Sequence, residues 1–91
     1  MTEALADVCR RIERIFVEIL HVVVSARTDL FGSGLLDSLS FILLLSALEV
    51  EFGIQIPVDG IEIERFRTVE RIAEVVEELR FPAHSDSQAA A

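Results

Sequence analysis

The chain lacks the covalent and metal-based supports on which many small proteins depend. Its 91 residues include a single cysteine, Cys9, so an intramolecular disulfide is excluded. No cluster of Cys and His residues has the spacing of a zinc site. Length predicts one small domain, which must be stabilised by its apolar core, and 52% of the residues are hydrophobic.

Lysine is absent altogether, and so are long uncharged apolar segments. The eight arginines face sixteen acidic residues, and the net charge of −8 makes nucleic-acid binding unfavourable. The uncharged run over residues 39–48 is far shorter than the roughly 20 residues of a membrane-spanning helix. The N-terminus has neither the basic region nor the apolar region of a signal peptide. We therefore expect a cytoplasmic protein without a membrane span.

The first third of the chain is typical of an amphipathic helix followed by a loop. Apolar residues recur at three- and four-residue steps from Leu5 to Val23, opposite a charged face, and predict a helix of about five turns. Residues 25–37 contain Gly32 and Gly34, which break this period. Four large apolar residues should anchor this loop to the core: Leu30, Phe31, Leu35 and Leu36.

Two further helices and a short one are expected in the rest of the chain. The second helix should run from about Ser38 to Phe52 and stop at Gly53. A short helix or turn is expected within 61–66, and Thr68 should cap a last helix. The buried stripe of the second helix is predicted to consist of Leu39, Ile42, Leu45 (or Leu44), Leu48 and Phe52.

These elements predict an all-α fold. It is a small bundle of three main helices plus one short helix, with a long ordered loop between the first and second helices. Pro82 should end the last helix, and the residues after it show no apolar period. We therefore expect a domain over residues 1–80 and a disordered tail over residues 81–91.

The pair Asp37-Ser38 stands where the apolar second helix begins, and three explanations are open for it. Either side chain is a favoured N-cap, which needs no further function. A nucleophilic serine would need a base, but His84 lies in the expected tail and His21 at the end of the first helix. A phosphoryl group on Ser38 would be stabilised by the positive end of the helix dipole. The residues alone favour a cap or an attachment site over a nucleophile.

The wider pattern resembles a known family. The run DLFGSGLLDSL, residues 29–39, is followed by ALEVEFGIQIP, residues 47–57, and by FRTV, residues 66–69. Together they are similar to acyl carrier proteins, and the resemblance covers nearly all of the chain except the tail. The first run is closer in its letters to the D-alanyl and peptidyl-type carriers than to the fatty-acid carrier.

The resemblance implies a carrier and not an enzyme. Ser38 would carry 4′-phosphopantetheine, transferred from coenzyme A by a phosphopantetheinyl transferase, and its thiol would hold an acyl or aminoacyl group as a thioester. Asp37 would match the acidic residue that engages the transferase and its metal. The partners implied are the transferase, an adenylating acyl or aminoacyl ligase, and downstream acyl-transfer enzymes. We expect a monomer that binds no metal itself.

One departure from the fatty-acid carriers concerns the second helix, where those carriers expose acidic residues. The first turns of this helix carry none. A helix that is apolar nearly all round is either buried or used for contact. The residues predicted to contact partners are Leu39, Phe41, Leu43 and Ile61. The alternative is an unmodified interaction module, in which the second helix is a docking or dimerisation face and Ser38 is only a cap.

Overall fold

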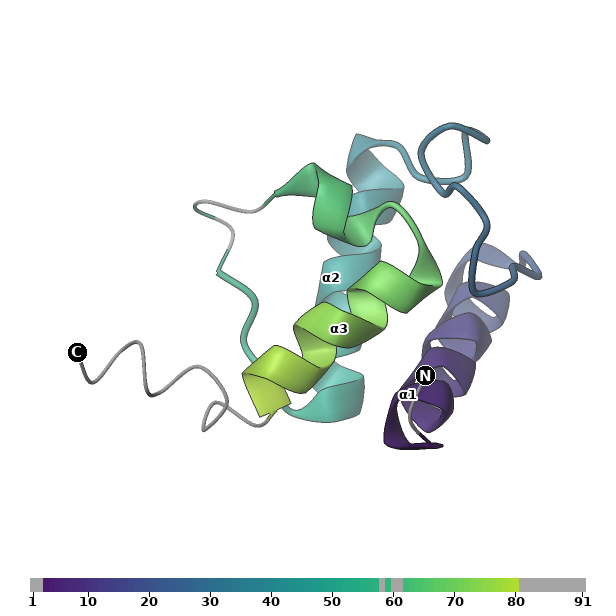
Figure 1. Ribbon diagram of the computed structural model, residues 1–91. Coiled ribbons are helices and arrows are strands. Elements are labelled where there is room, and N and C mark those ends of the chain that lie inside the picture. Colours follow the sequence, from purple (N-terminus) through teal and green to yellow (C-terminus); the bar gives the residue numbers. More distant parts are fainter. Residues whose placement is uncertain (1–2, 58, 60–61, 81–91) are drawn as a thin grey trace.

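Helices make up the ordered framework of the computed structural model, which describes residues 3–57, 59 and 62–80 (Figure 1). In chain order the elements are the α-helix α1 (Glu3–Ile15), the π-helical turn η1 (Phe16–Leu20), α2 (Ser38–Phe52), the 3₁₀ turn η2 (Ile63–Phe66) and α3 (Val69–Arg80). No strand occurs among these described residues, so the predicted all-α class is confirmed. The predicted tail, residues 81–91, lies outside the described residues.

The first helical segment, α1 followed directly by η1, spans residues 3–20 and so has the predicted length of about five turns. Val8, Ile12 and Phe16 are buried as expected, but the segment ends at His21, which adopts a left-handed conformation with φ of 57°. A π turn holds more residues than an α turn, so it rotates the residues after it off the original stripe. Ile19, within the π turn, is 38% exposed, and Val23, which lies beyond the end of the helical segment, is 88% exposed. The apolar stripe that the sequence shows is therefore buried at Val8, Ile12 and Phe16 but not at Ile19 or Val23.

The long loop between η1 and α2 is anchored, as predicted. Leu30 is fully buried and Leu36 nearly so, while Phe31 and Leu35 pack partly against the core. The Leu36 N–H donates to the Leu30 carbonyl over 3.0 Å, and the Leu30 N–H donates to the Arg67 carbonyl over 2.8 Å. The loop is thus held both to itself and to the segment between η2 and α3.

Helix α2 packs against α1 and α3 and lies behind α3 in Figure 1. Its buried residues are Phe41, Leu44, Leu45 and Leu48. The predicted stripe is right at Leu45 and Leu48 and wrong at Leu39 and Ile42, which are 70% and 53% exposed. Ten of its fifteen residues are apolar, and its three serines and two glutamates lie on different sides of the helix, so no single polar face indicates how the helix is rotated.

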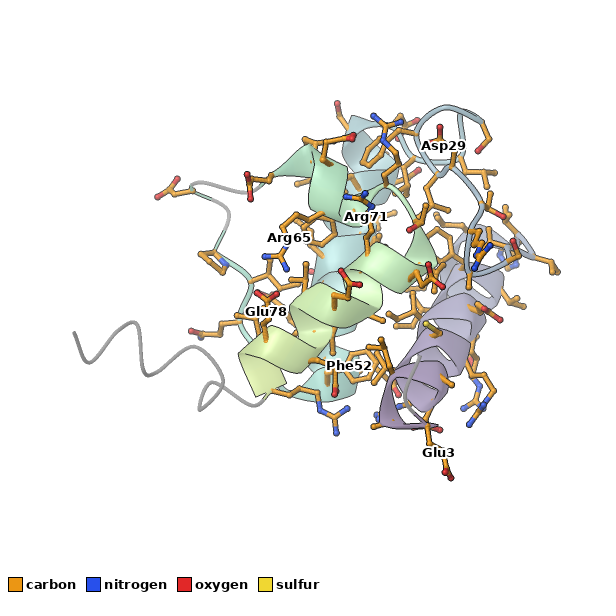
Figure 2. The ribbon with its side chains drawn as sticks, in the orientation of Figure 1. Glu3, Asp29, Phe52, Arg65, Arg71 and Glu78 are labelled. Carbon is orange, nitrogen blue, oxygen red and sulfur yellow. The ribbon has the colours of Figure 1, made fainter. Side chains whose placement is uncertain are left out.

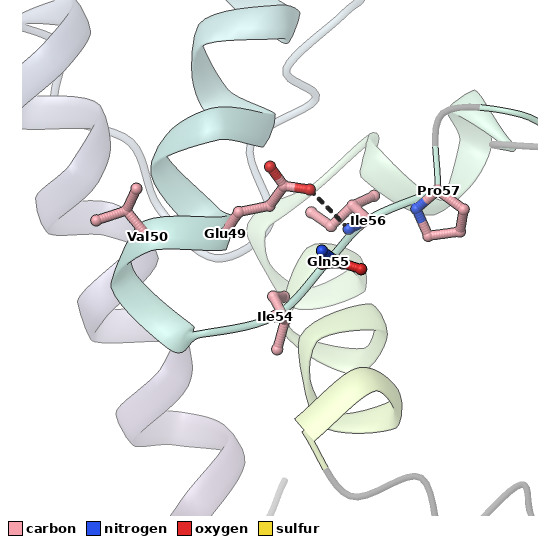
Figure 3. A pocket seen from close by; sticks show the side chains of 6 residues that line it. All are labelled: Glu49, Val50, Ile54, Gln55, Ile56 and Pro57. Atoms are coloured by element: carbon pink, nitrogen blue, oxygen red, sulfur yellow. Dashed lines mark hydrogen bonds between the residues drawn. The ribbon is translucent and has the colours of Figure 1, made fainter.

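The end of α2 follows its local sequence closely. Gly53 adopts the left-handed conformation with φ of 63°, as predicted for a C-terminal stop. Figure 3 shows the Glu49 carboxylate turned toward the following segment, where its Oε2 accepts a hydrogen bond from the Ile56 N–H over 2.8 Å. This contact and the burial of Ile54 and Ile56 hold the segment after α2 against the bundle.

The last helix is capped as predicted, because Thr68 Oγ1 accepts a hydrogen bond from the Arg71 N–H over 3.2 Å. Its buried residues are Val69, Ile72, Ala73, Val75 and Val76. The short turn η2 adds Phe66 to the core and is tied to α3 by an ion pair between Arg65 and Glu78 (Figure 2). None of the described helices has the length and apolar character needed to cross a bilayer.

Candidate functional site at the start of α2

The N-terminus of α2 is capped by Asp37. Its backbone is extended, with φ of −115°, and its Oδ1 accepts a hydrogen bond from the Ser40 N–H over 2.9 Å. The Asp37 carbonyl accepts the first helical bond, from the Phe41 N–H over 2.8 Å. Hydrogen bonds from the Ser40 backbone and side chain hold the pKa of the Asp37 carboxyl below its ordinary value. Asp37 is therefore ionised at neutral pH and engaged as the helix cap.

Ser38, in contrast, is the first helical residue and is exposed. Its hydroxyl makes no hydrogen bond with any described residue, because the capping role is filled by its neighbour. The sequence left open which member of the pair is the cap, and the structure assigns that role to Asp37. The Ser38 hydroxyl therefore has no structural role among the described residues.

The surroundings of Ser38 fit a phosphate ester. No acidic residue lies in the first turn of α2, and the helix dipole places partial positive charge there. A nucleophilic role finds no support in the described residues, since their one histidine, His21, ends η1 and is not bonded to Ser38. Among the described residues no group of three or more His, Cys, Asp or Glu could hold a metal ion.

The loop that leads to Asp37 is held to the segment between η2 and α3 by an ion pair. Arg67 Nη1 lies 3.2 Å from both carboxylate oxygens of Asp29, although the two residues are 38 positions apart. The Asp29 Oδ1 also accepts from the Gly32 N–H over 2.8 Å, and this bond is the main cause of a lowered pKa at Asp29. Arg67 additionally pairs with Glu64. These contacts hold the loop before Ser38 in one arrangement.

Three phenylalanines join the loop, α2 and η2 beneath the site. Phe41 lies edge-on to Phe31 and to Phe66, with ring centroids 5.7 Å and 5.3 Å apart. Phe41 is only 9% exposed. The prediction that Phe41 belongs to an exposed partner surface is therefore wrong: the loop and η2 cover its ring.

The other predicted partner residues divide differently. Leu39 is 70% exposed and Leu43 is 43% exposed, so both are accessible. Ile61 lies outside the described residues. Ile42 and Val50, which were not among the predicted partner contacts, are also exposed. Ile42 follows Leu39 by three residues and Val50 follows Leu43 by seven, and the buried residues of α2 have the same helical spacing.

Cys9 is buried in α1 next to Val8, as expected for a structural residue. Burial is the main cause of a raised pKa of its thiol, and the nearby Glu13 adds to it. Because the thiol form is favoured and covered, Cys9 is not suited to hold a thioester. Any carrier thiol must therefore come from outside the side chains of the described residues.

Known proteins match this chain over the region just described. The family model described as "Phosphopantetheine attachment site" matches residues 10–76, a span that includes the N-terminus of α2. The D-alanyl carrier protein of Streptococcus sanguinis (strain SK36) is 36% identical over 75 residues, which are 82% of this chain and 92% of the relative. That of Streptococcus pyogenes serotype M5 (strain Manfredo) is 35% identical over 68 residues, 75% of this chain and 84% of the relative.

Proposed function

The chain belongs to the family of carrier proteins that bear covalently attached 4′-phosphopantetheine, and we propose that Ser38 is the residue to which the group is attached. The observation that supports this proposal is that Asp37, and not Ser38, caps the helix. Asp37 satisfies the Ser40 N–H at the helix start, which leaves the exposed Ser38 hydroxyl without a partner among the described residues. Modification of Ser38 would therefore leave the helix cap intact.

The electrostatics at the start of α2 support the same assignment. An ester phosphate on Ser38 would carry its negative charge near the positive end of the helix dipole. The ionised Asp37 carboxylate stands next to it and is proposed to engage the transferase and its Mg²⁺ during attachment. When bound, the prosthetic group supplies a terminal thiol that holds cargo as a thioester.

The proposed cargo is an acyl or aminoacyl group. The relatives are named D-alanyl carrier proteins, which makes D-alanine the first cargo to test on this chain. The chain would act as a cytoplasmic carrier and as the substrate of other enzymes. These are a phosphopantetheinyl transferase, an adenylating ligase that loads the thiol, and an acyl-transfer enzyme that removes the cargo.

The test is the intact mass of the chain after incubation with coenzyme A, Mg²⁺ and a transferase of broad specificity. We expect a gain of one phosphopantetheine on the wild type and none on Ser38→Ala. The matched control is Ser46→Ala, because Ser46 is another exposed serine on α2 and its loss should leave the gain unchanged.

An unmodified wild type, under conditions that modify a known carrier, would overturn the proposal. If that unmodified chain also eluted as a dimer from gel filtration, an interaction module using the exposed face of α2 would be favoured instead. A gain that survives in Ser38→Ala would show that another residue is the attachment point.

A further inference from the structure

The loop before Ser38 is closed by a backbone bond that lies one residue before the helix cap, Asp37. There the Leu36 N–H donates to the Leu30 carbonyl over 3.0 Å, and both leucine side chains are buried. Because Leu36 and Asp37 are neighbours, this bond constrains the direction in which the chain enters α2. The position of the Ser38 hydroxyl therefore depends on how firmly Leu30 is held.

Leu30 is held from outside the loop, by the segment between η2 and α3. Its N–H donates to the Arg67 carbonyl over 2.8 Å. The side chain of the same arginine reaches the residue before Leu30, with Nη1 at 3.2 Å from both carboxylate oxygens of Asp29. Arg67 Nε is bonded in turn to the Glu64 carboxylate, over 2.6 Å and 2.9 Å, which orients the guanidinium. Arg67 therefore holds the loop through both its backbone and its side chain.

Asp29 connects this arginine to the interior of the loop. Its Oδ1 also accepts a hydrogen bond from the Gly32 N–H over 2.8 Å. The carboxylate lies so close to Gly32 that a Cβ added there would overlap it. The side chains of Asp29 and Arg67 are 50% and 41% exposed, so water screens the attraction between them. The pair is suited to favour one arrangement of the loop, and not to stabilise the whole bundle.

We propose that Asp29 and Arg67 are positioning residues for the attachment of phosphopantetheine to Ser38, an inference that rests on the proposed function. They act through Leu30 and Leu36, by keeping the loop closed so that a transferase meets the start of α2 in one arrangement. A protein binds its partner more weakly when the competent arrangement is only partly populated. Loss of the pair should consequently raise the KM of the transferase for this chain and leave kcat nearly unchanged.

The first measurement is the rate at which a transferase of broad specificity modifies the full chain, at several concentrations of the chain. We expect Arg67→Ala to raise KM by about two- to fivefold, the range typical of an exposed ion pair. Asp29→Asn should have the same effect, because its amide oxygen still accepts from the Gly32 N–H while the charge is lost. The matched control is Arg27→Ala, since the Arg27 side chain is 88% exposed and reaches Glu70 only at 4.0 Å. Its KM should equal that of the wild type.

A double variant tests whether the two residues act as a pair. Asp29→Asn combined with Arg67→Ala should raise KM no more than either change alone, because each one already removes the same ion pair. Effects that multiply in the double variant would contradict a shared role.

Hydrogen exchange of the unmodified variants, measured without the transferase, tests the loop itself. The N–H groups of Leu30 and Leu36 should exchange about two- to fivefold faster in Arg67→Ala than in the wild type. The Ile56 N–H, which is bonded to Glu49 outside the loop, should exchange at the wild-type rate. Circular dichroism of each variant confirms that its helices are intact.

A raised KM with unchanged exchange would show that the transferase contacts Arg67 directly, and would overturn the positioning role. Faster exchange with an unchanged KM, or a fall in kcat alone, would overturn it as well. An unmodified wild type would instead overturn the attachment site on which this inference rests, so the two failures are distinguishable.

Discussion

The two faces of α2 are made of the same kinds of side chain but have opposite environments. One face, Phe41, Leu44, Leu45 and Leu48, is buried against the rest of the bundle. The other, Leu39, Ile42, Leu43 and Val50, is exposed. On this helix the hydrophobicity of a residue therefore does not report its burial. Packing of α1, α3 and η2 decides which face is core, and the remaining face is free for contacts.

The largest expected effect is on the buried face. Phe41→Ala removes a ring packed against Phe31 and Phe66 and should lower the free energy of unfolding by about 3–5 kcal/mol. Its matched control is the next residue, Ile42→Ala, where more than half of the side chain is already exposed and the loss should stay below about 1 kcal/mol. Urea titration followed by circular dichroism measures both. Similar losses of unfolding free energy at the two positions would contradict the assignment of one face as buried and the other as exposed.

An intermediate effect on stability is expected at Asp37, because its side chain caps the N-terminus of the whole helix. At neutral pH Asp37→Ala should lower Tm by about 4–8 °C, whereas Asp37→Asn should change it little, since asparagine caps as well as aspartate. Thermal scans of the three proteins measure this. A drop in Asp37→Asn as large as in Asp37→Ala would contradict the capping role.

The smallest effect is the pH dependence of that cap. The folded-state pKa of Asp37 is lowered, so its ionised form contributes stability above its ordinary pKa near 3.8, and this contribution is lost as pH falls through the lower folded value. The gap in Tm between wild type and Asp37→Ala should therefore narrow below about pH 4. Asp37→Asn, which has no proton to gain there, should keep its advantage over Asp37→Ala at acid pH. A gap that widens on acidification would reverse the sign and contradict this account.

Local signals in the sequence predicted the elements and their ends well. Gly53 ends α2 through its own left-handed backbone conformation, and Thr68 caps α3 by accepting a hydrogen bond from a residue three positions later. Both signals are local, so both can be recognised in the sequence. The anchoring of the loop was also predictable, since several large apolar residues in a short loop, such as Leu30, favour its packing against the core. Position 38 was singled out by the same local chemistry, although the sequence could not tell whether Asp37 or Ser38 was the cap.

What could not be predicted depends on residues far apart in the chain. The rotation of α2 follows from where Phe31 and Phe66 meet Phe41, and a helix with no polar face does not reveal it. The ion pair between Asp29 and Arg67 joins residues 38 positions apart, and no local sequence pattern predicts it. The π turn at η1 moved Ile19 off the buried stripe for a similar reason, because periodicity assumes a constant number of residues per turn.

The central claim is that Ser38 carries the prosthetic group, and localisation of the group within the chain tests it most directly. Wild-type protein treated with coenzyme A and the transferase is digested, and the peptide that contains residues 34–45 is sequenced by tandem mass spectrometry with its phosphopantetheine still attached. The account predicts fragment ions that place the group on Ser38, with Ser40 unmodified. Fragment ions that place it on Ser40, or on a serine in any other peptide, would contradict it.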